Sequence, residues 1–95
     1  MVTEVVYIIA LPDKEEELGQ AIIRGLDVIR QHPGCIAANV TRCIEQPRRF
    51  MLTNTWTSLD AHIVDFRGSP LFPQWRSHIA GLVDGAPEVL HYQVF

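Results

Sequence analysis

An unbroken apolar run near the amino terminus, Val5-Val6-Tyr7-Ile8-Ile9, constrains the fold of this chain more than any other feature. Its β-branched and aromatic residues favour an extended strand. A strand with one face in water alternates apolar and polar residues, whereas a run without alternation indicates burial on both faces. We therefore predict a strand from residue 2 to the Leu11-Pro12 break, and we expect the fold to cover both of its sides.

The next segment has the pattern of an amphipathic helix. Its apolar residues recur at intervals of three and four and form one stripe, made of Leu18, Ala21, Ile22, Gly25, Leu26 and Ile29. Asp13 and Glu16 have the spacing of a capping box at the start. His32-Pro33-Gly34 stops the pattern. These signals predict a helix over residues 13–31 whose stripe faces the core.

The rest of the chain predicts two strands, two helices and a closing strand. Strands are expected at 35–43 and 49–56, joined by a turn. Ser58 and Ser69-Pro70 have the residue types of helix starts, and 89–95 is extended again. By the period of two, one face of the strand at 49–56 carries Phe50, Leu52, Asn54 and Trp56, and the other carries Met51, Thr53 and Thr55.

The element order β-α-β-β-α-α-β predicts an α+β fold of the ferredoxin-like kind. Ninety-five residues fit a single domain over 1–95. Right-handed crossovers give a four-stranded antiparallel sheet of order 4-1-3-2 with every helix on one face. The other sheet face would be an exposed apolar patch. We therefore expect a homodimer in which two sheets pack face to face.

Charge and cysteine content exclude several classes of protein. A net charge of −3 argues against a nucleic-acid partner, and the small basic group of Arg42, Arg48 and Arg49 fits a solvated hairpin turn. Cys35 and Cys43 would lie ~25 Å apart on an extended strand, too far to bridge. We expect both thiols to be free, and the sequence shows no basic leader and no apolar run long enough to span a membrane. These features predict a cytoplasmic protein without membrane contact.

No motif for a metal or a nucleotide cofactor is present. The four histidines show no ligand pattern such as H-E-x-x-H, and no glycine-rich loop follows a predicted strand. We therefore expect the protein to work without a cofactor or a metal.

Several motifs together resemble the antibiotic biosynthesis monooxygenase (ABM) family. They are Trp56-Thr57-Ser58-Leu59-Asp60-Ala61-His62, then Phe66, Ser69-Pro70, Phe72, Trp75 and Arg76, with Pro33-Gly34-Cys35 and Gln46-Pro47-Arg48-Arg49-Phe50 upstream. The likeness spans nearly the whole chain and implies a dimeric α/β barrel. The family includes quinone-forming monooxygenases, haem degraders, a phospho-sugar isomerase and uncharacterised proteins.

Members that oxidise polyketide anthrones have an asparagine four before the tryptophan, a tyrosine six after it and an arginine twenty after it. Those positions hold Leu52, His62 and Arg76 here. Histidine thus replaces tyrosine, and the asparagine is missing, although Asn54 lies on the same strand face. Haem degraders have a histidine ligand in the position of Arg76 and an asparagine in that of Val6, so haem cleavage is not expected.

The resemblance implies a cofactor-independent monooxygenase for a small aromatic, hydroquinone or polyketide-like substrate. Its apolar pocket would lie between sheet and helices, lined by Phe50, Leu52, Trp56, Phe66, Phe72 and Trp75. His62 is the candidate base, since imidazole titrates near neutrality. Arg76 would hold an oxyanion, and Asn54 would hydrogen-bond the substrate.

Each of these residues also has a purely structural alternative. His62 would then bond a backbone carbonyl, and Arg76 would pair with Asp65 or Asp84 at the surface. Asn54 would satisfy local backbone groups, and Trp56 and Trp75 would be core residues. For the whole protein, the alternatives are a non-oxidative module that binds an apolar ligand, or a cyclase or isomerase that uses acid–base chemistry at His62.

Overall fold

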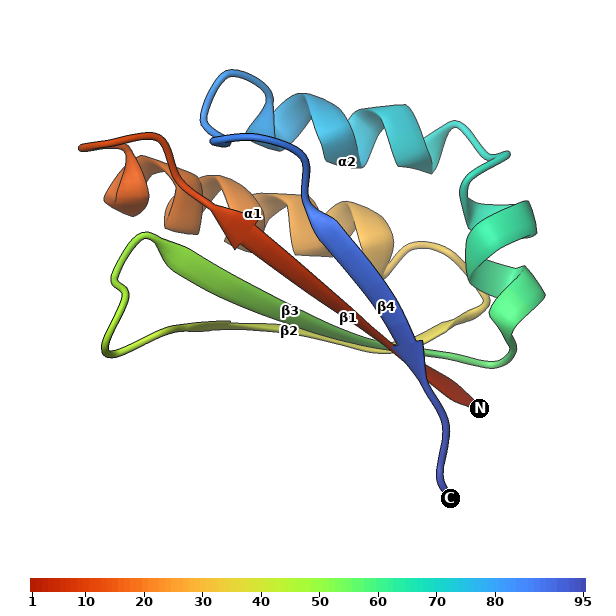
Figure 1. The fold of residues 1–95 in the computed structure, drawn as a ribbon. Coiled ribbons are helices and arrows are strands. Elements are labelled where there is room, and N and C mark those ends of the chain that lie inside the picture. The colour runs from red at the N-terminus through yellow and green to blue at the C-terminus, as the bar shows by residue number, and fades with distance from the viewer.

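Strands and helices follow one another along the chain in the expected order, β-α-β-β-α-α-β. The computed structural model describes all residues 1–95. Its elements are β1 (Val2–Ile9), α1 (Glu15–Ile29), β2 (Cys35–Arg42), β3 (Arg49–Trp56), the π-helix η1 (Ala61–Phe66), α2 (Leu71–Ile79) and β4 (Glu88–Tyr92). Figure 1 shows the helices on one side of the sheet.

The four strands form one antiparallel sheet in the order β2-β3-β1-β4. Read from the other edge this is 4-1-3-2, so the predicted ferredoxin-like topology is confirmed. In the centre of the sheet, Val6 pairs with Leu52 of β3 on one side and Val89 of β4 on the other. This register decides which side chains meet at the site described below.

Helix α1 begins later than predicted, at Glu15, and ends at Ile29. Asp13 has a φ of 65°, in the left-handed region, so it belongs to the preceding turn and cannot open a helix. The predicted capping box is wrong: the residue before the helix, Lys14, makes no side-chain cap bond. Glu16 instead pairs with Arg42 of β2 at 2.7 Å.

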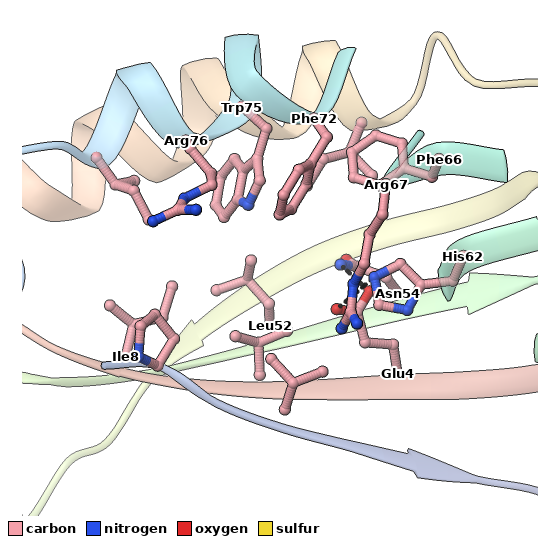
Figure 2. A pocket seen from close by; sticks show the side chains of 15 residues that line it. Glu4, Ile8, Leu52, Asn54, His62, Phe66, Arg67, Phe72, Trp75 and Arg76 are labelled. Carbon is pink, nitrogen blue, oxygen red and sulfur yellow. Dashed lines mark hydrogen bonds and ion pairs between the residues drawn. The ribbon is translucent and has the colours of Figure 1, made fainter. Parts of the chain in front are cut away.

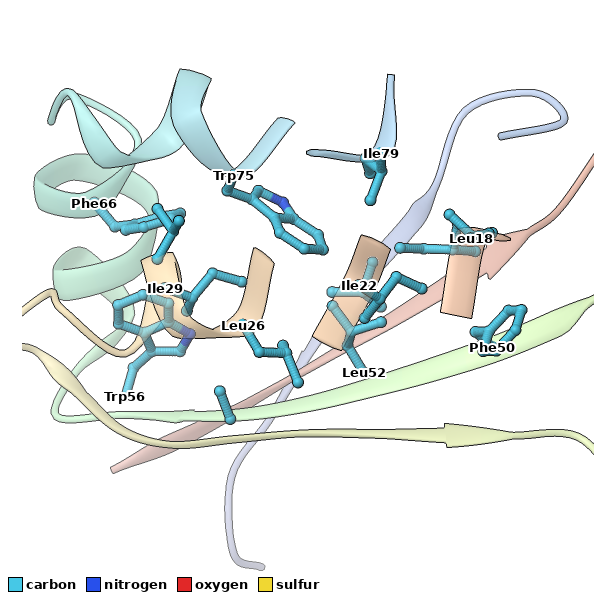
Figure 3. Close-up of a cluster of buried hydrophobic side chains, with 14 of the residues drawn as sticks. Leu18, Ile22, Leu26, Ile29, Phe50, Leu52, Trp56, Phe66, Trp75 and Ile79 are labelled. Atoms are coloured by element: carbon cyan, nitrogen blue, oxygen red, sulfur yellow. The ribbon is translucent and has the colours of Figure 1, made fainter. Parts of the chain in front are cut away.

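The apolar stripe of α1 is buried at every predicted position. Figure 3 shows its side chains between those of α2 and those of the sheet. Gly25 of α1 lies directly against the Trp75 side chain of α2, because a Cβ built there would lie 2.5 Å from Cε3 of Trp75. The absence of a side chain at Gly25 allows the indole to lie against α1.

Strand β3 alternates as predicted: Phe50, Leu52, Asn54 and Trp56 are buried, and the residues between them are only partly covered. Strand β1 follows the same alternation, with Glu4, Val6 and Ile8 buried. Within one chain, therefore, only one face of β1 is covered. Val5 and Tyr7 on its other face stay partly accessible.

The segment after Ser58 is wound as a π-helix, wider than the short helix we expected. The Ala61 N–H donates to Ser58 Oγ at 3.1 Å, and the Arg67 N–H donates to the His62 carbonyl five residues earlier at 3.2 Å. Ala61, His62 and Phe66 face inward, whereas Leu59 is exposed. A π-turn thus presents His62 and Phe66 to the interior together.

Two further expectations concern the cysteines and the membrane. Cys35 and Cys43 are both free thiols. None of the helices has the length and apolar character needed to cross a bilayer.

Candidate functional site

A cavity of about 400 Å³ lies between the sheet and the helical layer (Figure 2). Its wall is mainly apolar and comes from β1, β3, β4, α1, α2 and the segment around η1. The lining residues are Glu4, Val6, Ile8, Ile29, Leu52, Asn54, His62, Phe66, Arg67, Phe72, Trp75, Arg76, Ile79, Pro87 and Val89. This size and composition suit a small, largely apolar ligand.

A buried carboxylate cluster forms one part of the cavity wall. Oε1 of Glu4 accepts hydrogen bonds from Asn54 Nδ2 at 3.1 Å and from Trp56 Nε1 at 3.0 Å. Strand pairing places Glu4 directly opposite Asn54. Glu4, Asn54 and Trp56 are at most 5 % exposed. Burial of a carboxyl group is unfavourable unless donors compensate for lost water, and the two N–H groups supply part of that compensation.

His62 extends this cluster through both of its ring nitrogens. Nε2 lies 3.2 Å from Glu4 Oε2, and Nδ1 lies 2.8 Å from Nε2 of His91. The imidazole stacks on the Trp56 indole, with ring centroids 5.0 Å apart and planes 25° from parallel. His62 therefore does not serve as the carbonyl-bonded helix residue of the structural alternative.

Glu4 contacts one ring nitrogen of His62 and His91 contacts the other, so the oxygen and nitrogen atoms of the three side chains do not point to a common site. No group of three or more His, Cys, Asp or Glu side chains is arranged to hold a metal ion. The cluster is a linear chain of titratable groups.

Burial shifts the pKa values of the Glu4 carboxyl and the His62 imidazole in opposite directions. It raises the pKa of Glu4, and the hydrogen bonds from Asn54 and Trp56 offset only part of that rise. Burial, helped by Arg67 and His91, lowers the pKa of His62 to about 4. His62 is thus neutral at pH 7, and its 3.2 Å contact with Glu4 joins a carboxyl group to a neutral ring. It is not a pair of opposite charges.

Two arginines lie in the cavity wall without an acidic partner. Figure 2 shows Arg67 extending from the helical layer toward Glu4 and Asn54. Arg76 makes no ion pair, and its guanidinium carbon lies 5.7 Å from the centre of the Phe72 ring. The surface salt bridge from Arg76 to Asp65 or Asp84 is absent, and Asp84 instead pairs with Arg48 at 2.8 Å. Both cations remain available to an anionic group of a ligand.

The amide of Asn54 has one unused hydrogen-bonding atom. Its Oδ1 is buried and has no partner within the chain. In this orientation the NH₂ group of Asn54 donates to Oε1 of Glu4, which also accepts the indole N–H of Trp56. Asn54 lines the cavity. Its oxygen is thus a buried acceptor without a partner in the chain, on a residue of the cavity wall.

Most of the residues proposed from sequence meet at this cavity, and two do not. Leu52, Asn54, His62, Phe66, Phe72, Trp75 and Arg76 all line it. Phe50 lies further along β3, against Gly19 of α1 and below the Arg42 guanidinium. Trp56 is fully buried behind His62. Because strand β3 is longer than the cavity, Phe50 packs beyond one end of the cavity and Trp56 beyond the other.

Sequence reasoning missed Glu4, Arg67 and His91. Glu4 directly precedes the apolar run and shares the inward face with Val6 and Ile8, but an unbroken apolar run does not reveal which face turns inward. The register Glu4↔His91 then brings the histidine to the same side of the sheet. The signal for this site in the sequence was a polar residue, Glu4, at an inward-facing strand position. Its partners could not be predicted from the sequence, because they depend on strand pairing.

Comparison with known proteins agrees with this architecture. Residues 1–78 match the family model of the antibiotic biosynthesis monooxygenases. The chain is similar to uncharacterized protein YczJ of Bacillus subtilis (strain 168), with 27 % identity over 79 residues and 83 % of each chain covered. The chain belongs to the antibiotic biosynthesis monooxygenase family, as its motifs suggested.

Solved structures give the same fold. A Bordetella bronchiseptica protein, whose name places it in this family, superposes with a TM-score of 0.93 at 29 % identity, covering 99 % of this chain and 96 % of the other. One from Deinococcus radiodurans, named for the same family, gives a TM-score of 0.82 at 23 % identity, covering 100 % and 93 %. The second likeness concerns the fold alone.

Proposed function

We propose that this protein is a cofactor-independent monooxygenase that oxidises a small aromatic substrate of the anthrone or hydroquinone type. The observation that carries the proposal is an apolar cavity whose wall combines a Glu4–His62 pair with an unpartnered amide oxygen. A phenolic hydroxyl would lie in the cavity beside this pair and the Asn54 side chain. The aromatic body would lie against Leu52, Phe66, Phe72 and Trp75.

The chemistry needs a base, donors for an anion and a site that excludes water. The base removes a proton from the substrate and leaves an electron-rich carbanion or phenolate. That anion gives its electrons to dioxygen and forms a carbon–oxygen bond, and the resulting peroxide takes up a proton. Loss of the second hydrogen from the same carbon then breaks the O–O bond. One oxygen atom stays as a carbonyl and the other leaves as water.

Arg67 and Arg76 suit the anionic stages of this sequence. Neither forms an ion pair within the chain, and both line the cavity. In a mostly apolar site, a guanidinium stabilises a developing oxyanion more strongly than it would in water. We therefore assign them to the phenolate and peroxide oxygens.

A homodimer through the outer sheet face is part of the proposal. That face carries Val5 beside Leu90 and Tyr7 beside Met51, and Leu90 is 42 % exposed in the single chain. Packing two such faces would cover the second side of β1. Two free cysteines favour a reducing compartment, so we place the dimer in the cytoplasm.

Oxygen uptake with two probes, the anthrone dithranol and a naphthohydroquinone, tests the proposed reaction. Wild type should consume oxygen faster than buffer alone and should incorporate one labelled atom from ¹⁸O₂ into the product. His62→Ala should reduce the rate about a hundredfold or more, since acid–base groups contribute 10²–10⁴-fold. Val64→Ala is the control, because Val64 is exposed on η1 and does not line the cavity.

Product mass separates this function from its alternatives. Gain of one oxygen with loss of two hydrogens supports the monooxygenase. An unchanged mass with altered structure would indicate an isomerase or cyclase. Saturable binding without any product would indicate a binding module. Oxygen uptake no faster than in buffer, for both probes, would contradict the proposal.

A further inference from the structure

We propose that Glu4 is the catalytic base of the cavity and that it exchanges its proton with solvent through His62 and His91. The proposal rests on the oxygenase function, because the substrate of that reaction would supply the proton that Glu4 removes. The path itself depends only on contacts within the chain.

The three groups form a continuous line along the inner face of the sheet, from the cavity to the edge strand β4. Glu4 Oε2 lies 3.2 Å from His62 Nε2, and His62 Nδ1 lies 2.8 Å from His91 Nε2. Glu4 and His62 line the cavity, whereas His91 does not. His91 lies on the edge strand β4 and is only half-buried. The line therefore ends where a proton can reach water.

Glu4 is better placed than His62 to receive a proton from a ligand. Each nitrogen of a neutral imidazole offers one hydrogen-bonding site, and both sites of His62 face protein groups. A carboxylate oxygen has two lone pairs, so Oε2 of Glu4 keeps one free while it contacts His62. Contacts of this length tighten when a ligand closes the site.

Proton transfer along this line leaves both histidines neutral. With Glu4 protonated, Oε2–H donates to His62 Nε2, and His62 Nδ1–H donates to His91 Nε2. Each proton then moves one position outward, and the Nδ1 proton of His91 passes to water. Glu4 becomes a carboxylate, and both rings change from the Nδ1–H to the Nε2–H tautomer. One proton leaves Glu4 and one reaches solvent.

The surroundings favour this transfer over formation of a charged histidine. Burial raises the pKa of Glu4 and lowers that of His62, so a neutral relay costs less than an imidazolium–carboxylate pair. The other groups around Glu4 are Asn54 and Trp56 from β3, Arg67 after η1, and the Cys35 thiol of β2. Of these, the Arg67 charge favours the ionised carboxylate.

Imidazole ¹⁵N NMR without any ligand tests the path. As the pH rises through the titration of Glu4, followed by its ¹³C carboxyl signal, His62 and His91 should change together from Nδ1–H to Nε2–H. Glu4→Gln should abolish the change, and Gln93→Ala, just beyond β4, should keep it. A His62 tautomer that stays constant while Glu4 titrates would overturn the proposal, and this wild-type result does not depend on any variant folding.

Turnover of dithranol tests the role of the base. Glu4→Gln should lower kcat about a hundredfold or more. His91→Gln should lower kcat less and shift its pH dependence, while KM changes little. Full activity of Glu4→Gln would overturn the proposal and leave the oxygenase function standing. Absence of turnover by wild type would remove the oxygenase function, and the tautomer measurement would then decide the relay by itself.

Discussion

The indole N–H of Trp56 lies 3.0 Å from Oε1 of Glu4, so the residue that ends β3 holds the carboxyl group of β1 in place. Trp56 is fully buried and does not line the cavity. It acts on the site through Glu4 and through its stacking on His62. This tryptophan, one of the motif residues shared with the family, thus contacts two residues of the cavity wall from behind.

Trp56→Phe removes this donor while keeping an aromatic ring in the core. We expect the pKa of Glu4 to rise further, because a hydrogen bond that favours the carboxylate is lost. The free energy of unfolding should fall by about 1–3 kcal/mol, since a buried acceptor loses a partner. Carboxyl ¹³C NMR and urea denaturation measure the two effects. An unchanged Glu4 titration would contradict the assigned role.

Glu4→Gln should make the protein more stable at alkaline pH. The folded-state pKa of Glu4 is raised, so its contribution to stability is complete below the unfolded value of 4.5 and is lost as pH rises through the folded value. Glutamine keeps the shape and cannot ionise. We expect the variant to be more stable than wild type at pH 8, and we expect the difference to vanish near pH 4. A wild type more stable than the variant at pH 8 would contradict this.

The lowered pKa of His62 predicts that the folded protein loses stability in mild acid. Its pKa is lowered from 6.5 to about 4 in the folded state, so the unfolded chain binds the proton first. Between pH 6.5 and 4 the free energy of unfolding should fall by up to ~3 kcal/mol. Glu4 acts in the opposite direction, so the difference between wild type and His62→Gln isolates the effect. A pH-independent difference would refute it.

Gly25→Ala should distort the helix pair. The new Cβ would lie 2.5 Å from Cε3 of Trp75, and both residues are buried. Overpacking of this kind typically costs about 1–3 kcal/mol. Because Trp75 lines the cavity, ligand binding should weaken as well. Arg24→Ala, one position earlier on the exposed side of α1, is the control and should change stability little. Thermal unfolding of both variants provides the measurement.

Leu90→Glu should dissociate the proposed dimer. Leu90 lies beside Val5 on the outer sheet face and is 42 % exposed in the single chain. A charge there would be buried without a partner between two sheets. Sedimentation should give a dimer for wild type and a monomer for the variant at micromolar concentration. Val64→Glu adds the same charge to the helical layer, at a residue 58 % exposed, and should remain dimeric.

The elements with strong periodicity were predictable from sequence alone. The α1 stripe and the inward face of β3 follow from spacing, because burial on one side selects apolar residues at fixed intervals. The start of α1 was not predictable in this way. Asp13 has the residue type of a cap, but its left-handed backbone depends on the turn from β1.

The polar half of the site depended on contacts distant in sequence. Asn54 was identified because it is polar on an otherwise apolar strand face. Glu4 and His91 are separated from it by much of the chain and join it only through strand pairing. Arg67 follows the π-helix, whose extra width a helix period of three to four residues does not anticipate. The register between paired strands brings the cluster together, and the spacing of residues along the chain does not predict that register.

The wide turn of η1 affects how relatives of this protein should be aligned. A π-turn contains one residue more than an α-turn, so a relative lacking that residue would wind the same segment as an ordinary helix. Counting forward from Trp56 would then assign the place of His62 to a neighbouring side chain. Superposition on the imidazole, rather than distance along the chain, identifies the equivalent position, and deletion of one residue here would separate His62 from Glu4 without altering either.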